Sequence, residues 1–338
     1  MKTLDKLMAS VIESGQQDTP DPADLDLLLY SPCPVKLAVK ERLDAVIKAY
    51  EEENDPIKIH IPMGCTSVDP FDPLHYESDP DKLPSIIASI GFGDFFRKGF
   101  SDKFVKTGLF EAVLPEKVTP LHEKAGIVDP KGHYTVYALT PYIFMVDKQR
   151  LGDTPPPEKW ADLLDPKYRG QINMCGDGDD MADAVLMLIY KDFGMEGIKK
   201  LAANANGLMH SSRMGKSGGA EKGGGIYILP YFFAETSKQP EYMEVIWPKD
   251  GTAASPIYFL AKKDARPRID KILEFFIKGF GEIPSAQWFL PLGGPLPPTH
   301  APENTIKWVG WDFIYDNDIT VLRDELNGTF RKLVKETF

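Results

Sequence analysis

The stretch over residues 153–180, DTPPPEKWADLLDPKYRGQINMCGDGDD, decides how the chain is divided. Three prolines stand near its start, and proline continues neither a helix nor a central strand. Residues 171–175 are then a short, mostly apolar run that predicts a strand, and the turn Gly176-Asp177-Gly178-Asp179 ends it. Aspartates in such a turn cap helices, so we expect a helix from about Met181. An α/β lobe typically begins with a break followed by a strand, a glycine turn and a helix. This order predicts that a second lobe begins within residues 153–180.

Before this stretch, short apolar runs alternate with a helical pattern. Residues 27–30, 57–61 and 85–90 are predicted to be strands, and residues 35–53 carry apolar side chains at helical spacing. Strands that alternate with helices predict a mostly parallel sheet with right-handed crossovers. A longer apolar segment, residues 134–146, is predicted to be a strand that runs out of this first lobe.

After the stretch, the pattern predicts a second set of helices and strands. We expect helices over residues 181–193 and 196–205, and strands over residues 226–229 and 243–247. A return strand over residues 256–261 leads to helices from Arg266 onward, which we expect to cover the first lobe. The predicted division is a lead-in over residues 1–24, a first lobe over residues 25–145 and 255–338, and a second lobe over residues 146–254.

Composition limits the class of partner. The chain has 338 residues and a formal net charge of −11, which argues against nucleic acid or an anionic membrane surface as the main partner. No apolar run approaches the ~20 residues that span a bilayer, so we expect no membrane-spanning helix. The first residues lack the pattern of a signal peptide. We therefore expect a cytoplasmic protein if Met1 is the natural start, and a periplasmic or extracellular one if a leader has been removed.

Three segments, taken together, resemble a known family. They are PPPEKWADLLDPKYRGQI (residues 155–172), LPSIIASIGFGDFF (residues 83–96) and VIWPKDGTAASPIYFLAKKDARP (residues 245–267). Their order and spacing resemble those of type II solute-binding proteins of ABC transporters, closest to the ferric-iron and polyamine branch. The resemblance implies a periplasmic-binding-protein-like type II fold, in which two α/β lobes hold a small ligand in a cleft by hinge closure.

The resemblance also implies partners. The expected ligand is an anion, a metal or a metal chelate, and the expected protein partner is the membrane component of an ABC transporter. The six histidines are scattered, and no Ser-His-Asp order or paired carboxylates stand out. The sequence therefore gives no specific support for catalysis, and we expect binding rather than an enzyme.

Three cysteines support an alternative function. Cys33 and Cys65 follow the first two predicted strands, and Cys175 ends the strand that opens the second lobe. Neighbouring strands lie about 4.8 Å apart, so Cys33 and Cys65 could reach one ion, and lobe closure could bring Cys175 to it. Three thiolates suit a soft metal or an iron–sulfur cluster, as in a cytosolic carrier, sensor or redox enzyme. The other interpretations are inert buried thiols and, in an exported protein, a Cys33–Cys65 disulfide.

Most of the candidate ligand-binding residues lie in loops that follow a predicted strand, because open α/β sheets bind ligands at the carboxyl ends of their strands. The set is Ser31, Cys33, Cys65, Thr66, Gly91, Phe92, Tyr142, Cys175, Gly176, Asp177, Ser211, Ser212 and Tyr231. The resemblance places Tyr231 where ferric-binding relatives supply an adjacent pair of tyrosines. Phe232 follows it here and cannot ligate a metal, so an aromatic lining of the cleft is the other interpretation of Tyr231.

Overall fold

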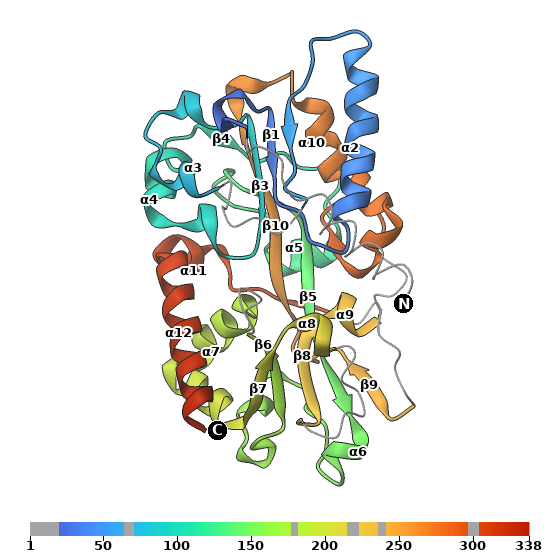
Figure 1. Ribbon diagram of the computed structural model, residues 1–338, viewed down its shortest axis with the longest axis vertical. Coiled ribbons are helices and arrows are strands. Elements are labelled where there is room, and N and C mark those ends of the chain that lie inside the picture. The colour runs from blue at the N-terminus through green and yellow to red at the C-terminus, as the bar shows by residue number, and fades with distance from the viewer. Residues whose placement is uncertain are drawn as a thin grey trace. The chain divides into compact units, whose positions relative to one another are not determined.

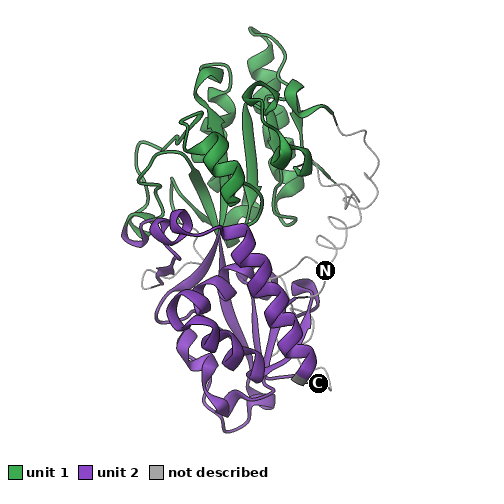
Figure 2. Ribbon diagram, turned by 90° about the vertical axis from the view of Figure 1, so that its left-hand side faces the viewer, with its two compact units in different colours: residues 1–123, 127–139, 256–297 green, residues 124–126, 140–255, 298–338 purple. Residues whose placement is uncertain are grey.

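The computed structural model describes residues 20–63, 71–176, 182–214, 223–235, 241–296 and 304–337. The chain folds into two compact units (Figure 2). Unit 1 comprises residues 1–123, 127–139 and 256–297, and unit 2 comprises residues 124–126, 140–255 and 298–338. Two long strands, β5 (Thr135–Asp147) and β10 (Thr252–Lys262), carry the chain from one unit to the other.

Unit 1 is built on three parallel strands. β1 (Leu27–Leu29) lies between β2 (Ile59–His60) and β3 (Ile86–Ile90), and β10 runs antiparallel to β3. All three leucines of β1 are buried, as expected of a continuous apolar run in a sheet with both faces covered. The shorter elements of this unit are α3 (Asp72–Tyr76), α4 (Lys98–Phe100), β4 (Phe110–Glu111), β11 (Leu290–Pro291) and most of α5 (Pro120–Ala125), whose last two residues belong to unit 2.

Two helices of unit 1 pack on this sheet. α2 (Lys36–Glu51) presents Val39, Leu43 and Ile47 as one apolar stripe, since residues four apart lie on the same face of a helix. This stripe joins the buried residues of β1, β3 and α10 (Asp270–Ile277) in a single core. Figure 1 shows α2 and α10 side by side along the strands.

Unit 2 repeats the α/β plan with a different strand order. β6 (Ile172–Cys175) runs parallel to β7 (Ala205–Met209) on one side and to β8 (Ile226–Pro230) on the other. β8 and β9 (Met243–Ile246) each run antiparallel to β5. The predicted second-lobe helices form one element, α7 (Asp183–Asn204), with non-helical backbone angles at Gly194, where the sequence predicts the break between them.

The chain's C-terminal part corrects the predicted division. Residues 298–338 belong to unit 2, whereas the sequence analysis assigned them to the first lobe. α12 (Ile319–Thr337) lies along α7 (Figure 1), with Leu326 and Phe330 fully buried. Beside them, β12 (Ile306–Lys307) pairs with β10, and α11 (Trp311–Asp316) precedes α12. An apolar helical stripe shows that a helix must be covered but not by which lobe, and here α7 covers it.

Gly224 offers a test of packing in unit 2. A Cβ atom at this position would lie 2.0 Å from the carbonyl oxygen of Gln171, a backbone atom that cannot move aside. We expect Gly224→Ala to lower the free energy of unfolding by about 3 kcal/mol or more. The matched control is Gly207→Ala in β7, where a Cβ atom meets nothing within 4 Å and the change should stay below about 1 kcal/mol. Urea denaturation measures both, and equal midpoints would contradict the described packing.

Asp183, the first residue of α7, offers a test of the α7–α12 contact. Asn327 of α12 donates a hydrogen bond to its carboxylate at 2.9 Å. Burial raises the pKa of Asp183 to about 6, although the Asn327 hydrogen bond and the charge of Arg323 lower it. The folded state therefore binds this proton more tightly than the unfolded chain does, and Asp183 makes stability fall as pH rises from about 4 to about 6.

Asp183→Asn removes the buried charge and keeps an oxygen that accepts from Asn327. We expect this variant to be more stable than the parent at pH 7.5 by up to about 2 kcal/mol, with the difference vanishing near pH 4. Denaturant titrations at both pH values measure it, with Asp312→Asn, an exposed carboxylate on α11, as the control for loss of one charge. A parent more stable than Asp183→Asn at pH 7.5 would show that the carboxylate stabilises the fold.

Candidate functional site

In unit 2, four strands end at one edge of the sheet. β8 and β9 run antiparallel to β5, β6 runs parallel to β8, and β7 runs parallel to β6. The carboxyl ends of these four strands therefore lie at the same edge. The first residues after these strands are Gly176, His210, Tyr231 and Trp247. Tyr142 of β5 lies at the same edge, because it pairs with Pro230, the last residue of β8. The structure thus brings together Tyr142, Gly176 and Tyr231 of the predicted set.

A buried thiol–hydroxyl pair ties two of these strand ends together. Cys175, the last residue of β6, and Ser211, the first residue of α8 (Ser211–Met214), are both fully buried. The Ser211 hydroxyl donates to the Cys175 sulfur at 3.0 Å, and the sulfur contacts the carbonyl oxygen of Ile228 at 3.6 Å. At the neighbouring Gly176, a Cβ atom would lie 2.9 Å from the Leu208 side chain. These contacts fix the backbone from which the edge residues project.

His210 and Ser212 form a polar turn at the end of β7. The Ser212 backbone N–H donates to His210 Nδ1 at 3.2 Å, and the Ser212 hydroxyl lies 2.8 Å from the same nitrogen. Because Nδ1 accepts a hydrogen bond, the neutral imidazole carries its proton on Nε2. The sequence analysis predicted Ser212 as a site residue but did not predict β7 itself, since its ANGLM sequence holds residues that strands disfavour.

An aromatic pair stands at the same edge. The rings of Tyr231 and Trp247 lie 4.9 Å apart at an angle of 59°, and Tyr231 is buried except for 5% of its surface. Tyr142 is similarly buried, at 7% exposure. Trp247 was missed as a site residue because its segment was assigned to the return crossover. The sequence analysis also extended the predicted strand to Trp247, whereas β9 ends at Ile246 and leaves Trp247 as the first residue after it.

In unit 1, the carboxyl ends of β1 and β3 hold four predicted site residues. Ser31 is fully buried and Cys33 is exposed, both in the turn after β1. Gly91 donates its N–H to the carbonyl oxygen of Pro256 at 2.8 Å. Phe92 is fully buried, with its ring 5.9 Å from that of Phe96. Gly91 and Phe92 therefore shape the loop by packing and backbone pairing.

Asp94, in the same loop after β3, was not predicted. Its backbone φ of 44° is unusual for a residue other than glycine, and such conformations gather at functional loops. The Ser89 hydroxyl donates to its carboxylate at 2.6 Å, which directs the carboxylate toward β3.

The remaining predicted residues, Cys65, Thr66 and Asp177, lie outside the described residues. Within the described ranges, no three His, Cys, Asp or Glu side chains gather as metal ligands would. Cys33 belongs to unit 1, and Cys175 belongs to unit 2, where its sulfur is bonded internally. The three-cysteine site stays a prediction, because it includes Cys65.

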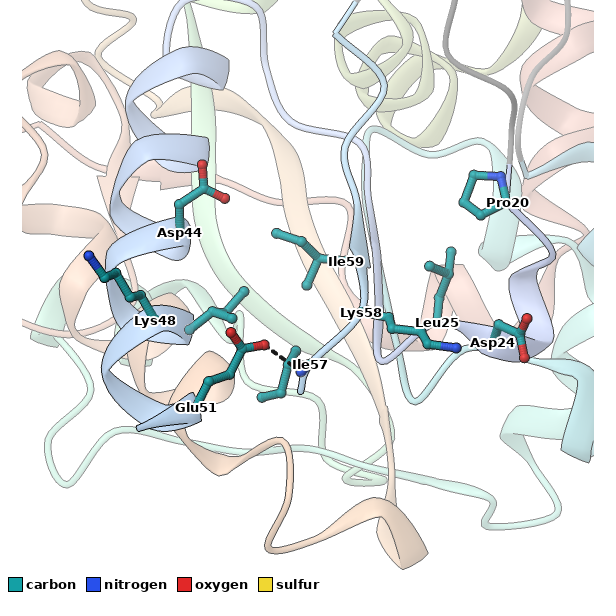
Figure 3. Close-up of a pocket in the computed structure, with 10 residues that line it drawn as sticks. Pro20, Asp24, Leu25, Asp44, Lys48, Glu51, Ile57, Lys58 and Ile59 are labelled. Atoms are coloured by element: carbon teal, nitrogen blue, oxygen red, sulfur yellow. Dashed lines mark hydrogen bonds between the residues drawn. The ribbon is translucent and has the colours of Figure 1, made fainter. Parts of the chain in front are cut away.

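Unit 1 also contains a pocket of about 620 Å³ at the other end of its sheet (Figure 3). It is lined by Pro20, Asp24, Leu25, Asp44, Ile47, Lys48, Glu51, Ile57, Lys58 and Ile59. In Figure 3, Glu51 of α2 points toward the segment that enters β2, where the Ile57 N–H donates to its carboxylate at 2.8 Å, whereas the Lys48 side chain points away from that segment. The pocket lies at the amino ends of β1 and β2, and open α/β sheets bind at the carboxyl ends, so the strand-end edges are the candidate site.

Comparisons with known proteins identify the family of the chain. The model of the family "Bacterial extracellular solute-binding protein" matches residues 81–317. No curated protein matches the chain. Among the helices in the described ranges, none is long and apolar enough to cross a membrane.

Solved structures of the same fold confirm the predicted class. The Bordetella ferric binding protein matches with a TM-score of 0.61 and 15% identity, over 92% of this chain and 99% of that one. Iron-bound HitA from Pseudomonas aeruginosa matches with a TM-score of 0.60 and 14% identity, over 89% and 99%. AfuA from Actinobacillus pleuropneumoniae, with fructose-6-phosphate bound, matches with a TM-score of 0.56 and 17% identity, over 92% and 98%. The fold is the type II periplasmic-binding-protein fold, and the chain belongs to the bacterial extracellular solute-binding protein family.

Proposed function

We propose that the protein captures its small solute through the carboxyl edge of unit 2, with Tyr142, Tyr231, Trp247 and the turn of His210 and Ser212 as the contacting residues. The observation that supports this proposal is that four strands, β5, β7, β8 and β9, bring these side chains to one edge of one sheet. Phenol, imidazole and hydroxyl groups donate hydrogen bonds to solute oxygens, and the Tyr231–Trp247 pair offers an apolar wall.

The fold by itself does not select the solute. Among the structural neighbours, HitA is iron-bound and AfuA has fructose-6-phosphate bound, so solute identity depends on side chains. The adjacent tyrosine pair implied by the resemblance is missing here, since Phe232 follows Tyr231. Tyr142 supplies a second phenol from the neighbouring strand instead. The candidate solute classes therefore remain an anion, a metal and a metal chelate.

The predicted partner and location belong to this proposal. The family's members are extracellular solute-binding proteins, and we propose that this one delivers its solute to the membrane component of an ABC transporter. We place it in the ferric-iron and polyamine branch on the three sequence segments that resemble that branch. The predicted hinge closure likewise stays a prediction.

Tyr231→Ala tests the proposed edge. The substitution removes a phenol and one face of the aromatic pair, so we expect the Kd of any solute that the parent binds to rise about 10- to 100-fold. Titration calorimetry measures this after thermal-shift screening of ferric and other metal ions, inorganic phosphate, citrate, ferric citrate, fructose 6-phosphate and fructose. Tyr76→Ala is the matched control, because Tyr76 is 84% exposed on α3 of unit 1. Unchanged affinity in Tyr231→Ala would remove this edge from the binding surface.

The cysteines permit a separate test of the alternative function. In the native, metal-free protein we expect a thiol-alkylating reagent to label the exposed Cys33 rapidly and Cys175 at least about 100-fold more slowly, since Cys175 is fully buried. Peptide mass spectrometry measures both rates, and unfolding in urea should equalise them. After anaerobic reconstitution with iron and sulfide, slower labelling of Cys33 together with bound iron would support a cysteine-ligated cluster, and an unchanged rate would exclude Cys33 from one.

A further inference from the structure

Asp183 and Asn327 form a polar contact between two helices of unit 2. Asp183 is the first residue of α7, and Asn327 lies near the middle of α12, 144 residues away along the chain. The Asn327 side-chain N–H donates to one carboxylate oxygen of Asp183 at 2.9 Å. Leu326 and Phe330, on either side of Asn327 in the sequence, are fully buried. The contact is therefore a polar link beside buried apolar side chains.

The Asn327 amide is satisfied on one side only. A carboxylate accepts hydrogen bonds and cannot donate them, so the amide turns its NH2 group toward Asp183. The amide oxygen, Asn327 Oδ1, is buried and has no hydrogen-bond partner among the described residues. A buried acceptor without a donor destabilises the contact that holds it, and such an atom needs an explanation.

Protonation of Asp183 supplies the missing donor. A neutral carboxyl group has one O–H donor and one carbonyl acceptor, which match the oxygen and the NH2 group of a primary amide. Neutral Asp183 can therefore make two hydrogen bonds with Asn327, the existing one from Nδ2 and a second from its own O–H to Oδ1. The ionised carboxylate can make only the first. The unpartnered oxygen is thus explained as the acceptor of a hydrogen bond that depends on a proton.

The surroundings of Asp183 favour its neutral form at mildly acidic pH. Burial is the largest influence and brings its pKa to about 6; the charge of Asp324 acts in the same direction, whereas the Asn327 hydrogen bond and the charges of Arg323 and Arg331 lower the pKa. These three charged groups all lie on α12. Because the pKa returns toward 3.8 when the contact opens, the closed contact is favoured at low pH and loosens as the pH rises.

α12 is the element that such a contact can control. It is an outer helix of unit 2, which packs on α7 and β7, and Val321 on it is 60% exposed. Thr320 of α12 is buried, and its hydroxyl has no hydrogen-bond partner among the described residues. Elements that are packed on one side and incompletely hydrogen-bonded open locally more easily than core strands. One further hydrogen bond therefore changes how often α12 opens.

We propose that Asp183 and Asn327 form a proton-dependent latch for α12, in which two hydrogen bonds hold α12 on α7 when Asp183 is protonated and one of them is lost when Asp183 ionises. As the pH rises through about 6, α12 opens more often and uncovers the side of α7 along which it lies. The latch is independent of the proposed solute contacts, because neither residue is among them.

Hydrogen exchange of the full chain, measured by mass spectrometry, tests the latch. After correction for the intrinsic effect of pH on exchange, peptides from α12 should have an opening constant about 4-fold larger at pH 7.5 than at pH 5.5. This factor follows from a pKa of about 6 in the closed contact and 3.8 in the open one. Peptides from β1 and β3 of unit 1 should change by less than about 1.5-fold.

Asp183→Asn mimics the protonated form, because its NH2 group donates to Asn327 Oδ1 as the carboxyl O–H does. We expect α12 of this variant to open equally at both pH values, within about 2-fold of the parent at pH 5.5. Glu325→Gln is the matched control. It neutralises an exposed carboxylate of the same helix and should keep the parent's pH dependence.

NMR gives a second readout that needs no change at Asp183. In protein with isotope-labelled asparagine, the side-chain carbonyl carbon of Asn327 should shift between pH 5.5 and 7.5 with a midpoint near 6, because it accepts a hydrogen bond only from neutral Asp183. The signal is assigned by its absence from Asn327→Leu.

Four results would overturn the latch. In the first, α12 of the parent opens equally at both pH values. In the second, Asp183→Asn keeps the pH dependence, which would assign it to another group. In the third, all peptides of unit 2 change in parallel, which would mean that the proton acts on the whole unit and not on α12. In the fourth, the Asn327 carbonyl signal does not move, which removes the second hydrogen bond.

Discussion

The parallel pairing of β6 with β7 and β8 is the constraint on which the candidate site of unit 2 depends. Parallel strands run in one direction, so residues far apart in the sequence, such as Gly176, His210 and Tyr231, must meet at one edge. The buried hydrogen bond from Ser211 to Cys175 then joins two of those strand ends. Residues within the sheet supply rigidity, and the residues just beyond it supply chemistry.

The fold class was predictable because it depends on periodicity along the chain. Continuous apolar runs marked β1 and β3, and the break at Gly194 in α7 followed from the two predicted helices. The placement of residues 298–338 was not predictable, because an apolar stripe on α12 does not say which surface covers it. The sequence analysis did not predict β7, because its short sequence has a weak preference for strands. In the structure, pairing with β6 outweighs that weak preference.

The site was predictable only where position along a strand decides it. Gly176 and Tyr231 follow from that rule, whereas Tyr142 and Trp247 lie within predicted strands, and only the observed register and strand end place them at this edge. The sequence also could not show that the Cys175 thiol accepts a hydrogen bond from Ser211 and contacts the Ile228 carbonyl oxygen, because both partners are far from it in the chain.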